Sequence, residues 1–154
     1  MAGSRWRAKG VIDNLSIQQK MVTVKVNVET TQNGFCALID LLPGCVVSVK
    51  GNILKLKKEV QSSIDFYIEC AKKDKEKYPK VFDGDYTLRY SPNNIRTALN
   101  LYKGLVSLSA LSQISGINQR QLSHYLNGTS NPRKEQEEKI ICGMRELGKE
   151  LQMV

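Results

Sequence analysis

The sequence predicts an α+β protein in which a sheet with one long helix precedes an all-helical unit. Three observations indicate this order: apolar residues alternate in the first part of the chain, one apolar stripe of helical period follows, and only helical patterns come after residue 93. Strands followed by a run of helices are typical of an α+β unit joined to a separate helical module. We therefore expect one domain at residues 21–92 and a second at residues 93–154, with the boundary near Ser91-Pro92-Asn93.

The first strands are predicted by strict alternation. Val22, Val24, Val26 and Val28 alternate with polar residues, which is the period of a half-buried strand. Gln32-Asn33-Gly34 then indicates a tight turn, because Asn and Gly accept positive φ at little cost. A returning strand from Phe35 to Asp40, a break at Pro43-Gly44 and a third strand from Cys45 to Val49 complete this part.

A long helix follows, with Asn52 as its expected N-cap. Its apolar residues recur at steps of 3, 4, 4, 3 and 4, which makes one stripe suited to covering a sheet: Ile53, Leu56, Val60, Ile64, Tyr67 and Ala71. The stretch from Tyr78 to Gly84 breaks the helix, and Tyr86 to Tyr90 is a short fourth strand. The order is therefore β-β-β-α-β.

Four helices are expected in the second unit. The first carries Ile95, Ala98, Leu99 and Tyr102 and stops at Gly104; the second begins near Ser107 or Ser109 and ends at Ser115. The third runs from Gln119 to Asn127, capped by Asn118 with Gln121 reaching back to it. The last begins at Asn131-Pro132 and carries the stripe Ile140, Met144, Leu147 and Leu151.

The segment from Leu108 to Gly128 predicts a helix-turn-helix. Gly116 supplies the positive φ of a tight turn, and Leu111, Ile117 and Leu122 would pack the two helices together. The outward side chains of the second helix suit base edges, and two cations follow near the last helix; the expected DNA contacts are Gln119, Arg120, Ser123, His124, Asn127, Arg133 and Lys134. The alternatives are an α-hairpin in a helical bundle, whose outer face is polar in any case, and a bystander role for His124.

The composition bounds the partners and the compartment. A net charge of +8 indicates a polyanionic partner or, because it is spread along the chain, a solvated basic surface. The cysteines are far apart and form no CxxC pair, so we expect small buried hydrophobes in a reducing compartment and neither a metal site nor a cofactor: Cys36, Cys45, Cys70 and Cys142. No apolar run of a signal peptide or a membrane span is present, which predicts a cytoplasmic protein with no membrane partner.

Residues 1–20 show no clear period. We interpret them as a poorly ordered leader or as an extension that is foreign to the fold. A basic arm that touches nucleic acid, through Arg5, Arg7 and Lys9, is the alternative.

The layout from Val22 to Val154 resembles the HicB family of antitoxins in its longer form, which ends in a helix-turn-helix. Gly34-Phe35 and Asp40-Leu41-Leu42-Pro43-Gly44-Cys45 carry the N-terminal likeness, with one leucine more than the D-L-P-G-C turn of the family. Leu111 to Gly128 and Asn131-Pro132-Arg133 carry the C-terminal likeness. The family's Thr-x-x-Glu start of the long helix is replaced here by Asn52-Ile53-Leu54-Lys55.

This resemblance implies a degenerate RNase H-like domain that binds a HicA-type toxin, which is an mRNA-cleaving protein. It also implies that the second module binds the operator DNA of its own operon, as a homodimer or a higher even oligomer, and represses it. Two alternatives are a stand-alone helix-turn-helix regulator without a toxin and a metal-dependent nuclease, whose carboxylates would come from Glu29, Asp40, Glu59, Asp65 and Glu69. We expect no catalysis, because the strands offer only two carboxylates and the single histidine lies on the expected DNA face.

Overall fold

The computed structural model describes residues 21–154, and the leader predicted at residues 1–20 lies outside the described residues. The elements are β1 (Val22–Thr31), β2 (Gly34–Ile39), β3 (Val46–Val49), α2 (Ile53–Lys73), the short 3-10 helix η1 (Lys80–Asp83), β4 (Tyr86–Pro92), α3 (Ile95–Leu101), α4 (Leu108–Ser115), α5 (Gln119–Asn127) and α6 (Lys134–Gln152). The α+β class and the β-β-β-α-β order are confirmed.

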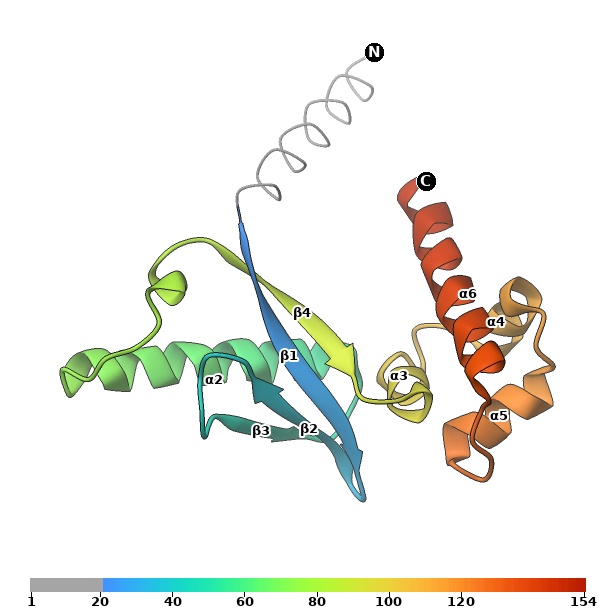
Figure 1. Ribbon diagram of the computed structural model, residues 1–154, viewed down its shortest axis with the longest axis horizontal. Helices are drawn as coiled ribbons and strands as arrows, with labels where there is room; N and C mark the ends of the chain where they lie inside the picture. The colour runs from blue at the N-terminus through green and yellow to red at the C-terminus, as the bar shows by residue number, and fades with distance from the viewer. Residues whose placement is uncertain (1–20) are drawn as a thin grey trace, which may run out of the picture.

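One mixed sheet has the strand order β3-β2-β1-β4. The chain returns through α2, so β4 pairs with β1 in parallel, whereas β2 is antiparallel to both β1 and β3. Val26 of β1 therefore lies opposite Ile39 on one side and Tyr90 on the other. Figure 1 shows α2 running across the sheet, with α3 to α6 gathered beyond the end of β4.

The first core lies between α2 and one face of the sheet. The buried strand residues are Val24, Val26, Val28, Phe35, Ala37, Ile39, Val47 and Val49. The helix contributes the predicted stripe with one correction: Ile68 is buried and Tyr67 is only half-buried. Both positions fit a period of 3.6, but Ile68 has no hydroxyl to keep in water.

The turns use fewer positive φ angles than the sequence suggested. Asn33 does not adopt one, and only Gly34 does, with φ of 154°. A Cβ on Gly34 would lie 2.1 Å from the carbonyl oxygen of Val49, so close approach of β3 also requires glycine here. In the next turn the exposed Leu41 adopts a left-handed φ of 71°, while Leu42 is buried.

A second core lies within the helical module, and α3 belongs to both cores. Ile95 and Leu99 of α3 pack with residues of α4, α5 and α6, whereas Leu101 is fully buried in the first core. The hydroxyl of Thr97 lies 2.7 Å from the hydroxyl of Thr30 on β1 and donates to the side chain of Asn93 at 2.7 Å. Each hydroxyl has one hydrogen, so Thr30 donates to Thr97.

The expected start of the last helix and the expected burial of the four cysteines are both wrong. Helix α6 begins at Lys134, with Arg133 as the N-cap, so Pro132 precedes the helix. The backbone of Arg133 is extended, and a residue that follows proline in the chain is free to adopt this conformation before the helix begins. Cys142 is exposed and the other three cysteines are half-buried. The buried side of α6 carries Ile140 and Gly143, and position 142 points away from it.

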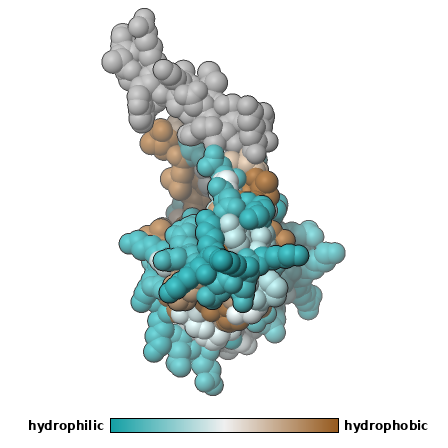
Figure 2. Space-filling view, turned by 90° about the vertical axis from the view of Figure 1, so that its left-hand side faces the viewer, coloured by the Kyte–Doolittle hydropathy of each residue, from teal (hydrophilic) through white to brown (hydrophobic). Residues whose placement is uncertain are grey.

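The end of the molecule formed by the last turns of α2 is largely hydrophilic, as Figure 2 shows. Among residues 21–154, no helix combines the length and the apolar character that crossing a membrane requires.

Candidate nucleic-acid interface

Helices α4 and α5 are joined by a turn of three residues. The hydroxyl of Ser107 caps α4 by accepting from the amide of Ala110, and Gly116 ends it with φ of 75°. The side chain of Asn118 caps α5 by accepting from the amide of Arg120 at 2.8 Å. Gly128 ends α5, again with φ of 75°. The sequence predicted the roles of Gly116 and Asn118, and Ser107 is one of the two serines that it offered for the start of α4.

The two helices are held together by apolar contacts and one hydrogen bond. Leu111, Ile117 and Leu122 are buried in the second core, as expected. The hydrogen bond comes from Ser112, whose hydroxyl donates to the carbonyl of Ile117 at 2.6 Å. The expected return of Gln121 to Asn118 is wrong; the amide of Gln121 instead donates to the hydroxyl of Ser130 at 3.4 Å. A side chain that is already bonded to the following loop cannot reach back to the N-cap.

The predicted contact residues lie on the side of α5 that faces away from its core. Gln119, Arg120 and Asn127 are exposed, and Ser123 and His124 are half-buried. The opposite side of the helix is formed by Leu122, Tyr125 and Leu126, all buried. Helix α5 therefore presents a polar row without carboxylates.

The start of α6 provides two more exposed cations, Arg133 and Lys134. Side chains of Asn52, Asn94, Ser107 and Asn118 cap the helices α2 to α5, but no side chain caps α6. Its first amide groups are therefore left to solvent or to an acceptor from outside. Within residues 21–154, no ion pair engages Arg120, Arg133 or Lys134.

The stretch of sequence that contains α3, α4 and α5 has charges of one sign only, although Glu137 of α6 lies near Arg96 and Gly128. Residues 86 to 134 contain no Asp or Glu, and their six cations are Arg89, Arg96, Lys103, Arg120, Arg133 and Lys134. This part of the chain thus carries a net charge of +6, whereas the whole chain carries +8. A positive surface of this kind attracts the phosphates of nucleic acids.

Arg96 is a candidate contact residue that the sequence reasoning missed. Its guanidinium lies against the end of α5, so close that a Cβ on Gly128 would be 2.8 Å from the Arg96 Cζ. From the same helix, the side-chain amide of Asn100 donates to the carbonyl of Leu126 at 2.9 Å. The long run without acids was the available signal, but the contact itself depends on how α3 packs.

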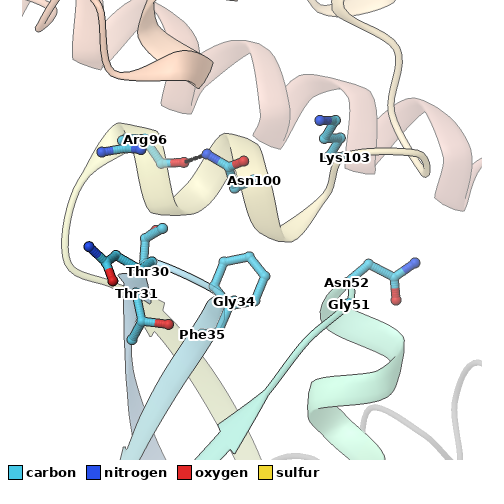
Figure 3. A pocket seen from close by; sticks show the side chains of 10 residues that line it. Thr30, Thr31, Gly34, Phe35, Gly51, Asn52, Arg96, Asn100 and Lys103 are labelled. Atoms are coloured by element: carbon cyan, nitrogen blue, oxygen red, sulfur yellow. Dashed lines mark hydrogen bonds between the residues drawn. The ribbon is translucent and has the colours of Figure 1, made fainter.

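A hollow of about 520 Å³ lies between the end of the β1–β2 hairpin, the start of α2 and α3 (Figure 3). Arg96, Asn100 and Lys103 line it from α3 and the segment after it, and Thr30, Thr31 and Asn52 line it from the other side. Asn52 and Asn100 are already engaged, as the cap of α2 and as the bond to Leu126. The lining contains no carboxylate, cysteine or histidine.

The carboxylates considered for a nuclease do not gather at one place. Asp40 accepts from the side chain of Asn27, and Asp65 is exposed and accepts from Gln61. In the described part of the chain, no three side chains of His, Cys, Asp or Glu lie close enough together to hold a metal ion.

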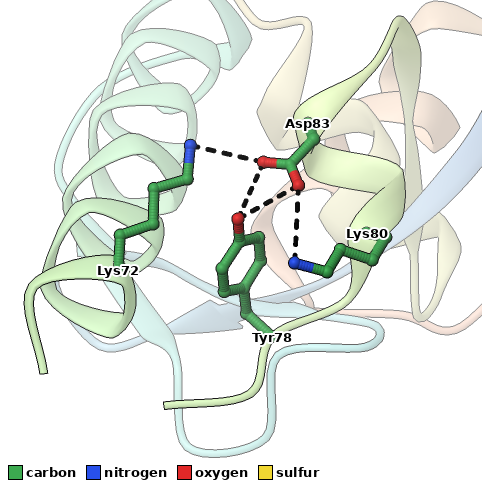
Figure 4. A network of polar contacts seen from close by, with 4 residues as sticks. All are labelled: Lys72, Tyr78, Lys80 and Asp83. Carbon is green, nitrogen blue, oxygen red and sulfur yellow. Dashed lines mark hydrogen bonds and ion pairs between the residues drawn. The ribbon is translucent and has the colours of Figure 1, made fainter. Parts of the chain in front are cut away.

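One charged network lies at the far end of α2 (Figure 4). The Tyr78 hydroxyl is 3.0 Å from both carboxylate oxygens of Asp83, and the ammonium groups of Lys72 and Lys80 lie 3.3 and 3.8 Å from that carboxylate. Partial desolvation raises the pKa of the Asp83 carboxyl, but the hydrogen bonds and the two cations outweigh it and lower that pKa. The hydrogen bond to Asp83 and the nearby negative charge raise the pKa of Lys72.

No family model, no curated protein and no solved structure matches this chain.

Proposed function

We propose that this chain binds DNA with α4 and α5, and that α5 lies in the major groove as the reading helix. The observation that carries the proposal is the exposed row of α5, in which Gln119, Arg120 and Asn127 project from a helix fixed at both ends by its caps. Gln and Asn pair well with adenine, and Arg pairs with guanine, in the major groove. Ser123 is short enough to let the backbone approach the bases.

The neighbouring cations fit contacts to the phosphate backbone. Arg133 and Lys134 lie where the uncapped amides of α6 begin, and a phosphate oxygen is a suitable acceptor for such amides. Arg96 lies beside the C-terminal end of α5, which leads into the same segment. We assign these three residues to positioning on the duplex and Arg120 to base reading.

We further propose that the protein is an antitoxin of the HicB type, which represses its own operon and neutralises a HicA-type toxin. The motifs around Gly34-Phe35 and Asp40 to Cys45 support this part, as does the likeness of Leu111 to Gly128. The order β-β-β-α-β, with one helix across a four-stranded sheet, supports a degenerate RNase H-like unit. A cytoplasmic location belongs to the same proposal.

The test of DNA binding is a titration of the full chain against the DNA upstream of its own gene and against DNA of random sequence. We expect Arg120→Ala to weaken binding to the upstream DNA by about 1–3 kcal/mol while random DNA is affected little. Lys58→Ala, on the exposed side of α2, is the matched control and should change neither. Equal losses on both DNAs would show that Arg120 contacts phosphate only.

The test of the antitoxin proposal is growth. We expect the small reading frame beside this gene to arrest growth when expressed alone, and co-expression of the full chain to restore it. Arg120→Ala should restore growth equally well, because toxin binding is assigned to the other unit. If the chain binds its upstream DNA but rescues no growth arrest, the stand-alone regulator replaces the antitoxin.

A further inference from the structure

The apolar stripe of α6 continues beyond the point where residues 21–154 cover it. Ile140 is fully buried and Met144 and Leu147 are half-buried, but Leu151, one turn further along the same stripe, is 63% exposed. A stripe with helical period marks the side of a helix that is suited to burial. The last turns of α6 thus present an apolar side that the described chain leaves open.

A groove of about 470 Å³ lies beside these turns, and we call it the α6 groove. It is lined by Gly104, Leu105, Val106, Ser107, Ala110, Leu147 and Leu151. Leu105, from the segment between α3 and α4, is 47% exposed. In Figure 1 the start of α6 lies near α5 and its C-terminal end lies at the opposite end of the module. A partner that packs on the C-terminal turns would therefore leave α5 free.

Two glycines in α6 indicate, independently of the groove, where another helix can approach closely. A Cβ on the buried Gly143 would lie 2.8 Å from Ile114, so this glycine permits the close approach of α4. Gly148 is exposed, and a Cβ there would meet no atom within 4 Å among the described residues. Glycine inside an exposed helix costs about 1 kcal/mol relative to alanine. Gly148 lies three residues before Leu151, so close approach by another helix at the groove would explain it.

The charges beside the groove fit a second copy of the chain. Arg145 and Lys149 are balanced by Glu146 and Glu150, so this stretch is neutral although the whole chain carries +8. Two copies can therefore meet here without the repulsion that their net charges cause elsewhere. A nucleic acid finds no net positive charge in this stretch, and a strongly basic or acidic partner gains little from its balanced charges.

We infer that the α6 groove is the interface of a homodimer, in which the stripes of two copies pack on each other around Leu147, Gly148 and Leu151. The inference rests on the proposed function in one respect, because a two-fold dimer presents two copies of α5 to an inverted repeat. The inference goes beyond the proposed function because it names the surface through which two copies meet, which the sequence did not indicate. The C-terminal turns of α6 from the two copies form the core of this interface.

Sedimentation velocity of the full chain at micromolar concentration tests this inference. We expect the wild-type chain to sediment as a dimer, with twice the monomer mass of 17.3 kDa. Leu151→Lys should weaken dimerisation by about tenfold or more, as the loss of a central apolar contact does. Leu54→Lys, at an equally apolar position on α2 that is 53% exposed, is the matched control and should remain a dimer. Both sites are exposed, so circular dichroism should be unchanged.

Gly148→Ala should change the stability of the helix and the affinity of the dimer in opposite directions. Alanine should stabilise the isolated helix, but its Cβ should weaken the close approach of a second copy, so the dimer should dissociate more readily. A monomeric wild-type chain would overturn the inference, whatever else covers the groove, and so would a Leu151→Lys chain that dimerises like wild type. If Leu151→Lys abolishes the dimer but the wild type binds no DNA, the inference stands and the proposed function fails.

Discussion

The hydroxyl of Ser112 donates a hydrogen bond of 2.6 Å to the main-chain carbonyl of Ile117, across the turn that joins α4 to α5. Because Ile117 is buried beneath that turn, the bond fixes the direction in which α5 leaves α4. A hydrogen bond of this kind contributes about 1 kcal/mol to stability. The placement of the proposed reading helix therefore depends on one small side chain.

Ser112→Ala should lower the free energy of unfolding by about 1 kcal/mol, measured by urea denaturation. Ser109→Ala is the matched control, since Ser109 is exposed on the same helix and gains the same helix propensity without losing a bond to Ile117. A Ser112→Ala chain as stable as the Ser109→Ala chain would show that the hydrogen bond contributes nothing.

Two glycines with positive φ should respond differently to alanine. Gly116→Ala should cost about 1 kcal/mol, because its Cβ meets no atom within 4 Å and only the left-handed φ is strained. Gly34→Ala should cost about 3 kcal/mol, because its Cβ must also displace the carbonyl of Val49. Thermal or urea unfolding of both variants checks this order, and equal losses would contradict the strand contact at Gly34.

The turn after β2 contains a strained residue that can be relieved. Leu41 has a φ of 71° and its side chain is 54% exposed, so little burial is lost when it is replaced. Leu41→Gly should raise the free energy of unfolding by about 0.5–1 kcal/mol, because glycine adopts this φ without strain. Leu42→Gly, at the buried neighbour, should instead lower the free energy of unfolding, and by a larger amount than Leu41→Gly raises it. A destabilised Leu41→Gly chain would show that Leu41 makes contacts that matter more than its strain.

The Asp83 network predicts a dependence of stability on pH. Its pKa is lowered in the folded protein, so Asp83 stabilises the fold above the ordinary carboxyl value of about 3.9, and this is lost as the pH falls through the lower, folded value. Wild type should therefore lose more stability than Asp83→Asn between about pH 6 and pH 2.5. Asp85→Asn, two residues away, should behave like wild type. Tyr78→Phe removes the hydroxyl that donates to the Asp83 carboxylate and should reduce the acid-dependent loss.

The sequence predicted features that depend on neighbouring residues. Asn52, Ser107 and Asn118 indicate where helices begin, because the side chain that caps a helix is within three residues of the amide that it bonds. The alternation of valines likewise predicted the buried face of β1 at Val24, Val26 and Val28, whereas Val22 at the start of the strand is exposed. The polar row of α5 follows from the same local periodicity.

Contacts between segments that are distant in the chain could not be predicted from the sequence. The parallel pairing of β4 with β1 joins residues that are more than sixty positions apart, such as Val24 and Leu88. The burial of Leu101 in the first core and the packing of Arg96 on Gly128 depend on how α3 lies between the two units. Local periodicity contains no information about such packing.

Selection of bound duplexes from a random DNA pool is the measurement that tests the central claim most directly. We predict that the full chain enriches an inverted repeat, and that Arg120→Ala loses the preference for guanine at one position of each half-site while the remaining positions are kept. Arg133→Ala should retain the same motif with weaker binding and a smaller salt dependence, as expected for a lost phosphate contact. If the wild-type chain enriches no sequence, or if Arg120→Ala enriches the same motif unchanged, α5 is not a reading helix and the proposed function is wrong.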